Sequence, residues 1–151
     1  MDSRPVSPWM KRAFAVTVFG LGLTGVAQMP IFSRYYIADV PGFGWLGDFV
    51  FTHMLHYALA AVFLFLGAYL AASRFLTWRS GHPLTGSGMV RVALYAGLVA
   101  TGAVRMIKNL QSVYMGEVTV MLVDWSHLFL AVVLLGVVLW ARWSGRRPYT
   151  E

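Results

Sequence analysis

The chain has no cysteine and few charged residues. The lack of cysteine excludes disulfides, thiolate zinc sites, iron–sulfur clusters and a cysteine nucleophile. Charged residues make up only 12% of the 151 residues, against about 25% in soluble domains, and 58% are hydrophobic. Lysine and arginine outnumber the acids by 12 to 6, but they lie between apolar runs, which excludes a basic nucleic-acid surface. The composition therefore predicts a protein of the lipid bilayer.

Four segments are long and apolar enough to cross a bilayer, which takes about 20 residues. They cover residues 13–30, 49–72, 89–107 and 118–141. The first is expected to remain as a helix, because no small-x-small cleavage site of a signal peptide follows it. No internal repeat is evident, so residues 1–151 are treated as a single domain. The expected fold is an all-α integral membrane protein, a four-transmembrane-helix bundle.

The basic residues outside the spans predict the orientation, because cytoplasmic loops are enriched in lysine and arginine. Nine of them fall on one side: Arg4, Lys11, Arg12, Arg74, Arg79, Arg91, Arg142, Arg146 and Arg147. The opposite side holds four of the six acids: Asp39, Asp48, Glu117 and Asp124. We therefore expect both termini in the cytoplasm.

Three of the four histidines lie inside apolar spans, where ionisable groups are costly and usually functional. At about 1.5 Å per residue, His56 lies roughly 11 Å inside the second span and His127 roughly 13 Å inside the fourth. These two spans run in the same direction, so both imidazoles are expected at similar depth in the outer half of the bilayer. The alternative for each histidine is a structural hydrogen bond between helices.

Two facing imidazoles without a thiolate, in a dry apolar pocket, fit the axial ligands of a b-type haem. Zinc or a non-haem metal would need a third or fourth ligand, which His53 and Asp124 could supply. The aromatic residues and glycines favour the macrocycle. His53 lies three residues before His56, so it could be the ligand instead, or could bond to a haem propionate, a quinone carbonyl or Asp124.

Small residues in the first span are candidates for contact with the cofactor. Gly22 and Gly25 belong to GLGLTG (20–25), which matches a dinucleotide-binding pattern but lies in mid-membrane, where that pattern has no meaning. Glycines at this spacing let helices approach closely, and the same lack of side chains makes room for a flat macrocycle.

Charged residues near the outer end of the third span are candidates for binding the cofactor's carboxylates. Arg105 and Lys108 stand three residues apart and could neutralise two haem propionates. The alternative is that their head groups only snorkel to the membrane interface. Asp124 is expected to pair with one of them or to carry protons between a quinol and the outer water.

The histidine motifs THMLHY (52–57) and DWSHLFL (124–130), set in four spans, resemble a known family. It comprises the four-helix b-type cytochrome subunits that anchor membrane-bound formate dehydrogenases and nickel–iron hydrogenases. The resemblance covers most of the chain in layout and implies the bacterial inner (plasma) membrane. It also implies electron relay between quinone and partner subunits of a redox complex, either iron–sulfur or cytochrome proteins. Histidines of that family's second and fourth helices, which correspond to His56 and His127, hold the outer haem.

The sequence departs from this family where the family holds an inner haem. The first span contains no histidine, and neither do residues 132–142. One haem b is therefore expected, with a quinone site near the outer side, for which His53, Asp124, Arg105 and Tyr114 are the candidates. The chain has no catalytic machinery of its own, so it would be a non-catalytic electron-transfer subunit. The competing interpretation is a cofactor-free membrane scaffold that anchors or assembles a larger complex.

Overall fold

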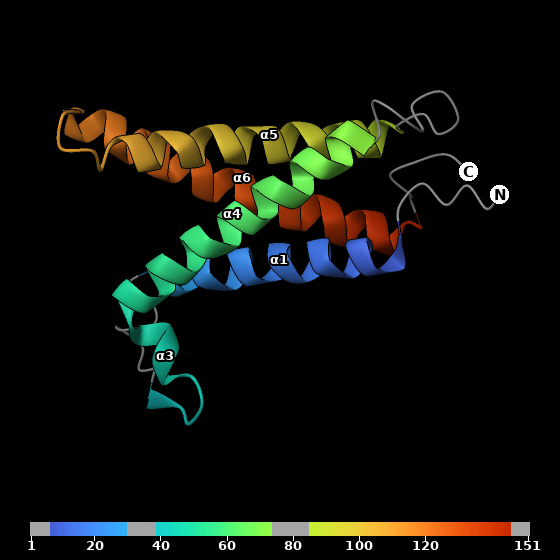
Figure 1. Cartoon of the computed structure of the whole chain (residues 1–151), viewed down its shortest axis with the longest axis horizontal. Coiled ribbons are helices and arrows are strands. Elements are labelled where there is room, and N and C mark those ends of the chain that lie inside the picture. Colours follow the sequence, from blue (N-terminus) through green and yellow to red (C-terminus); the bar gives the residue numbers. More distant parts are fainter. Residues whose placement is uncertain (1–6, 30–38, 74–84, 146–151) are drawn as a thin grey trace. The chain divides into compact units, whose positions relative to one another are not determined.

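The computed structural model describes residues 7–29, 39–73 and 85–145, and every regular element in these residues is helical. The helices are α1 (Pro8–Ala27), α3 (Gly44–Gly47), α4 (Phe49–Ser73), α5 (Gly86–Ile107) and α6 (Glu117–Trp143) (Figure 1). The four longer ones are each long and apolar enough to cross a membrane. The expected all-α membrane fold with four spanning helices is confirmed.

Two spans begin earlier than the hydrophobic pattern predicts, because polar caps lie ahead of the apolar runs. α1 begins at Pro8 rather than at residue 13, where the Ser7 hydroxyl accepts a backbone N–H at 3.2 Å and Pro8 suits the first helical position. α5 begins at Gly86 rather than at residue 89, because Thr85 caps it in the same way at 3.1 Å. α1 also ends at Ala27, three residues before the end of the predicted span.

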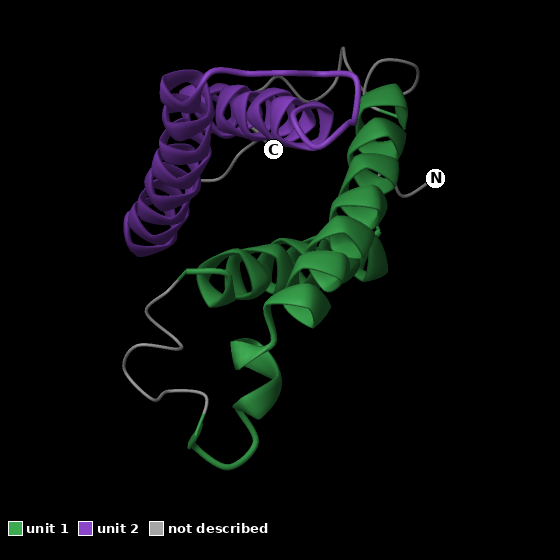
Figure 2. Ribbon diagram, turned by 90° about the vertical axis from the view of Figure 1, so that its left-hand side faces the viewer, with its two compact units in different colours: residues 1–79 green, residues 80–151 purple. Residues whose placement is uncertain are grey.

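The chain divides into two compact units, residues 1–79 and 80–151 (Figure 2). In the first unit α1 packs against α4, and the short helix α3 contacts both of them. In the second unit α5 packs against α6. Each unit is thus built around a hairpin of two membrane-length helices.

The two hairpins repeat one sequence pattern at their helix contacts. GLGLTG (20–25) in α1 contacts HYALA (56–60) in α4, and GLVATG (97–102) in α5 contacts HLFLA (127–131) in α6. The shared positions are Gly-x-x-x-Thr-Gly on the first helix and His-x-x-Leu-Ala on the second. The chain therefore contains a tandem repeat, contrary to the expectation that it has none.

Glycine and leucine make the close helix contact in both copies of the repeat. A methyl group on Gly20 would lie 2.9 Å from Leu59 Cδ1, and one on Gly97 would lie 3.1 Å from Leu130 Cδ1. Both separations are shorter than ordinary carbon–carbon contact, which begins near 3.5 Å. A side chain at either glycine would require the facing leucine to shift, so glycine suits the close approach of the two helices in each hairpin.

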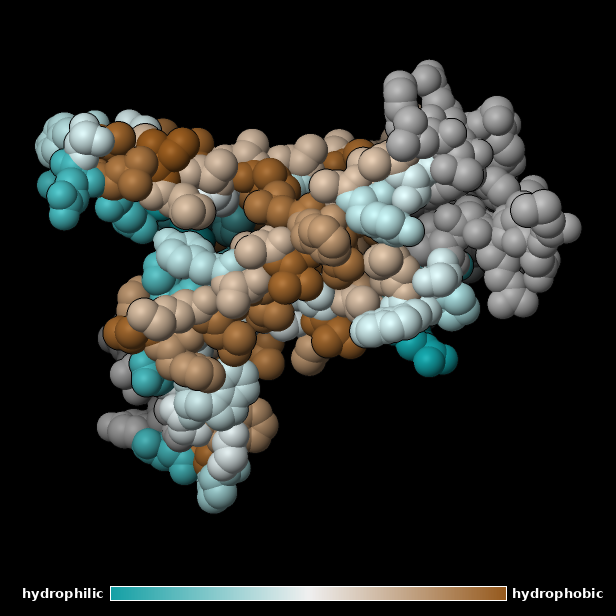
Figure 3. Space-filling view, in the orientation of Figure 1, coloured by the Kyte–Doolittle hydropathy of each residue, from teal (hydrophilic) through white to brown (hydrophobic). Residues whose placement is uncertain are grey.

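The helix surfaces that face away from these contacts are apolar (Figure 3). Large side chains such as Phe19, Phe65, Trp125 and Phe129 are each at least 66% exposed within the chain. Apolar surface of this extent is unfavourable in water but is solvated by lipid tails. Together with the four spanning helices, it identifies a multi-pass membrane protein in a lipid bilayer.

Candidate functional site

In the first unit, His56 of α4 is bound to a buried threonine of α1. Thr24 is only 1% exposed, and its hydroxyl oxygen lies 2.9 Å from His56 Nδ1. The next residue, Gly25, lies beside the ring, where a methyl group would be 3.5 Å from His56 Cε1. The imidazole therefore lies against the backbone of α1, held at one nitrogen by Thr24.

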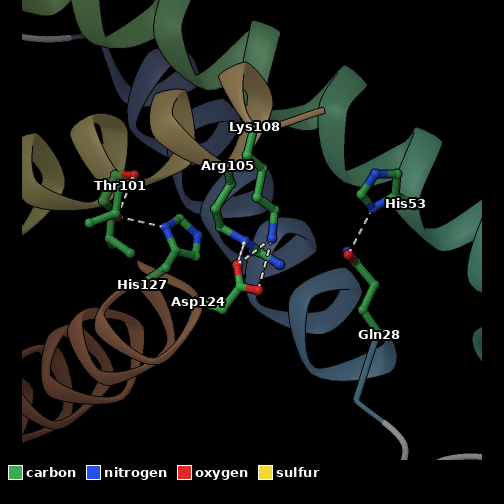
Figure 4. Close-up of polar contacts among 8 residues, drawn as sticks. Gln28, His53, Thr101, Arg105, Lys108, Asp124 and His127 are labelled. Carbon is green, nitrogen blue, oxygen red and sulfur yellow. Dashed lines mark hydrogen bonds and ion pairs between the residues drawn. The ribbon is translucent and has the colours of Figure 1, made fainter. Parts of the chain in front are cut away.

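In the second unit, His127 of α6 has the equivalent arrangement. The hydroxyl oxygen of Thr101 in α5 lies 2.8 Å from His127 Nδ1 (Figure 4). A methyl group on Gly102 would be 3.5 Å from His127 Cε1, as at the first site. The two histidines thus have the same partner atoms at the same positions of the repeat.

The position of the hydroxyl protons follows from a further pair of contacts. Thr24 Oγ1 lies 2.8 Å from the carbonyl oxygen of Gly20, and Thr101 Oγ1 lies 2.8 Å from that of Gly97. A carbonyl oxygen has no proton, so each hydroxyl must donate its only proton there. It then accepts a hydrogen bond from the histidine, which assigns the Nδ1–H tautomer and places the lone pair on Nε2.

His53, one turn before His56, forms a second polar pair with α1. Its Nδ1 lies 3.0 Å from the side-chain oxygen of Gln28, whose amide nitrogen donates to the Thr24 carbonyl at 3.1 Å (Figure 4). The ring stacks on Phe49 with centroids 5.4 Å apart, and its centroid is 4.4 Å from that of Tyr57. His53 is thus a polar group set between aromatic rings.

The equivalent positions of the second repeat carry an ion cluster instead. Asp124, one turn before His127, accepts a hydrogen bond from Arg105 Nε at 2.7 Å and from Lys108 Nζ at 2.9 and 3.0 Å (Figure 4). Arg105 occupies the repeat position of Gln28. Two cations and one carboxylate give the cluster a formal charge of +1, and the side chains are about one-third exposed for Arg105 and Asp124.

The structure brings some of the predicted site residues together and leaves others apart. Gly25 lies against His56, but a methyl group on Gly22 would meet nothing within 4 Å, so Gly22 takes no part in packing α1 on α4. Tyr114 is 93% exposed and lies in the segment between α5 and α6. The prediction that Asp124 pairs with Arg105 or Lys108 is confirmed, since it pairs with both.

Sequence reasoning missed three residues that contact the histidines. Thr24 and Thr101 bind the two intramembrane imidazoles, and Gln28 binds His53. The signal that could have found the threonines is the Thr-Gly pair four residues after a glycine, which occurs in both odd-numbered spans.

No three His, Cys, Asp or Glu side chains cluster in a metal-ion cage within the described part of the chain. The zinc alternative therefore finds no ready-made ligand set there. His56 belongs to the first unit and His127 to the second, so their joint binding of one iron stays a prediction. Searches against known protein families, curated proteins and solved structures find no match.

Proposed function

We propose that the chain is a haem b-containing membrane subunit that transfers electrons between a redox partner complex and the quinone pool. His56 and His127 would hold the haem, each through one imidazole. The observation that carries the proposal is the repeated histidine–threonine pair, which gives each hairpin one half-buried imidazole bonded in the same way.

The chemistry of these residues fits an axial haem ligand. In each pair the Nδ1–H bond leaves the lone pair on Nε2, the nitrogen through which histidine commonly binds a metal. The adjacent Gly25 and Gly102 keep side chains away from the ring edges. When bound, b haem supplies one-electron redox chemistry, and two histidine ligands keep other small ligands off the iron.

The repeat favours His56 over His53 as the ligand of the first hairpin. His56 shares its position with His127, including the threonine bond and the glycine contact, whereas His53 shares its position with Asp124. A carboxylate in that position binds Arg105 and Lys108 in the second hairpin. In both hairpins, the histidine that is paired with threonine would therefore be the haem ligand, and the residue one turn before it would have another role.

The ion cluster supports binding of the haem propionates. The guanidinium group has five N–H donors, and Asp124 engages Nε, so Arg105 can bind a second carboxylate. The net charge of +1 favours an anionic group at this end of the hairpin. Arg105 and Lys108 would thus hold the carboxylates of the cofactor, with Asp124 fixing both side chains in place.

The Gln28–His53 pair supports a quinone site in the first hairpin. Gln28 accepts the Nδ1–H of His53, so His53 Nε2 can accept a hydrogen bond from a quinol hydroxyl. Phe49 and Tyr57 flank the imidazole with aromatic faces that suit a flat ring. Oxidation of a quinol releases two protons and two electrons. His53 would accept one proton, the outer water would accept the other, and the electrons would pass one at a time to the redox partner complex.

The resemblance to the four-helix b-type cytochrome subunits and the distribution of lysine and arginine outside the spans support a membrane location for this subunit. We place it in the bacterial inner membrane with both termini in the cytoplasm, so the loop ends of both hairpins, where these polar pairs lie, face outwards. The chain has no soluble catalytic domain in its described part, so substrate chemistry would belong to iron–sulfur or cytochrome partner subunits.

Absorption spectroscopy and haem content per chain test the proposal on the purified full-length protein. We expect a Soret band, an α-band after reduction with dithionite, and one haem per chain. His56→Ala and His127→Ala should each abolish haem incorporation. The matched control is His53→Ala, which removes an imidazole one turn away and should retain haem while slowing reduction of the haem by a quinol.

Each departure from this result has a defined meaning. A protein without a Soret band would overturn the electron-transfer proposal and favour the scaffold. Loss of haem in His53→Ala but not in His56→Ala would exchange the two roles. Haem that survives in His127→Ala would place the site elsewhere, and two haems per chain would require ligands beyond this pair.

A further inference from the structure

The end of α1 fixes the orientation of the Gln28 side chain. The helix ends at Gln28, whose backbone N–H bonds the carbonyl of Val26 instead of continuing the helical pattern. Its side-chain nitrogen bonds the carbonyl of Thr24 at 3.1 Å. A carbonyl oxygen only accepts hydrogen bonds, so the amide nitrogen of Gln28 must face it, and the amide oxygen must point the other way.

This orientation decides which nitrogen of His53 carries a proton. Gln28 Oε1 lies 3.0 Å from His53 Nδ1 (Figure 4). An amide oxygen has no proton to donate, so Nδ1 must carry one. When the imidazole holds a single proton, Nε2 is therefore left with a lone pair and can only accept a hydrogen bond.

The ring of His53 has an aromatic neighbour on either side along α4. Phe49 lies four residues before it and Tyr57 four residues after it, with ring centroids 5.4 and 4.4 Å from that of the imidazole. Phe49 is 58% exposed and Tyr57 is 37% exposed, and aromatic faces of this kind suit a flat apolar ring. All of these contacts lie within the first unit, residues 1–79.

The two redox forms of a quinone differ in the hydrogen bond that they can form with His53. A quinol has hydroxyl groups and can donate a proton to the lone pair of Nε2. A quinone has only carbonyl oxygens, so its lone pairs would face that of Nε2 and both acceptors would stay unpaired. Unpaired acceptors away from water cost free energy, so the imidazole favours the reduced form of the ring.

We propose that Gln28 is the specificity-determining residue of the quinone site and makes this site selective for a quinol over the corresponding quinone. Gln28 does so by binding the Nδ1–H of His53, which leaves Nε2 as an acceptor. The inference rests on the proposed function, and it names the reduced form as the ligand that enters the site.

The first test compares the dissociation constants of duroquinol and duroquinone for the full-length protein in phosphatidylcholine liposomes, with protein-free liposomes as the blank. The ratio of the two constants does not depend on the amount of folded protein. We expect the wild type to bind duroquinol about 3- to 30-fold more tightly, the effect of one hydrogen bond formed against two acceptors left unpaired. The dimethyl ether of duroquinol lacks both hydroxyl protons and should bind no better than duroquinone.

Substitutions of Gln28 test its role in this selectivity. Gln28→Leu removes the acceptor for Nδ1–H, so the imidazole proton can occupy either nitrogen and the selectivity should fall to within about twofold. Gln28→Glu keeps an acceptor oxygen and should retain the selectivity. The matched control is Gln111→Leu, at an exposed glutamine between α5 and α6, which should also retain it. Gln28→Ala gives a second measurement if Gln28→Leu fails to insert.

The second test locates the proton directly by nitrogen NMR of the protein with isotope-labelled histidine. His53→Phe identifies the signals of His53 by their loss. Without ligand, we expect the wild type to carry a proton on Nδ1 and none on Nε2 of His53. Gln28→Leu should show a mixture of both tautomers.

The outcomes separate the role of Gln28 from the quinone site itself. Equal binding of duroquinol and duroquinone by the wild type, a proton on Nε2 of its His53, or unchanged selectivity in Gln28→Leu would overturn the role of Gln28 while the quinone site stands. Loss of selectivity in Gln28→Glu or in Gln111→Leu would overturn it as well. A wild type that binds neither ligand above the blank would overturn the quinone site of the proposed function, and this inference with it.

Discussion

The close contacts of the hairpins predict that three glycines of the same fold respond differently to one added methyl group. Alanine is favoured over glycine inside a helix by about 0.5–1 kcal/mol. Gly22→Ala should show this gain in full, because the added methyl would meet no atom within 4 Å. At Gly20 the methyl would lie 2.9 Å from Leu59 Cδ1, so the leucine must move.

The loss of stability in Gly20→Ala follows from the cost of overpacking a helix contact, about 1–3 kcal/mol. After subtraction of the gain from alanine, Gly20→Ala should lower the free energy of unfolding by about 0–2.5 kcal/mol. Gly97→Ala should fall between the other two, because its methyl would lie 3.1 Å from Leu130 and requires a smaller shift. The expected order of stability is Gly22→Ala, then Gly97→Ala, then Gly20→Ala.

The assay is unfolding of the purified protein in mixed micelles of mild detergent and increasing dodecyl sulfate, followed by far-ultraviolet circular dichroism. The wild-type protein is the reference, and the three variants change the same atom count. A Gly20→Ala protein at least as stable as Gly22→Ala would refute the reasoning, because it would show that α1 does not approach α4 as closely as the structure places it.

Two further predictions concern polar contacts and use the same unfolding assay. Asp124→Asn should destabilise the second hairpin by about 1–2 kcal/mol, between the values for an exposed ion pair and a buried charged hydrogen bond, because Arg105 and Lys108 lose their shared carboxylate. Asp39→Asn replaces an exposed acid and should change the free energy of unfolding by less than about 0.5 kcal/mol. Equal effects of the two variants would show that the ion cluster does not stabilise the hairpin. Asp48→Ala should destabilise α4 by about 0.5–2 kcal/mol, because Asp48 Oδ1 caps the helix by accepting the Phe51 N–H at 2.9 Å. Asp48→Asn should keep most of this stability, and a loss as large as that of alanine would show that the cap bond does not stabilise the helix.

The sequence predicts the four spans well because a bilayer imposes a length and a composition on any crossing helix. The end of α4 differs from its prediction by one residue, and those of α6 by one or two. The errors at the starts of α1 and α5 arise from Ser7 and Thr85, which cap the helices three or more residues before the predicted apolar run begins. Hydrophobicity alone does not predict this first helical turn, whereas capping preferences do.

The candidate site was harder to predict, because its polar contacts join helices that are distant in sequence. The intramembrane histidines are conspicuous as ionisable groups in apolar segments, but their partners Thr24 and Thr101 look like ordinary small residues of membrane helices. The repeat that links them is also hard to find, since its shared residues are few and the segments between the paired helices differ in length. It becomes visible once the contact residues are compared.

The pattern shared by the two hairpins gives a physical reason for the similar depth that the sequence predicts for the two histidines. A hairpin crosses the membrane twice and returns to its starting side, so a second copy begins in the same orientation as the first. Equivalent residues of the two copies then share a depth, and His56 and His127 are equivalent residues. The pairs one turn away differ between the two copies: Gln28 binds His53 in the first hairpin, and Arg105 binds Asp124 in the second.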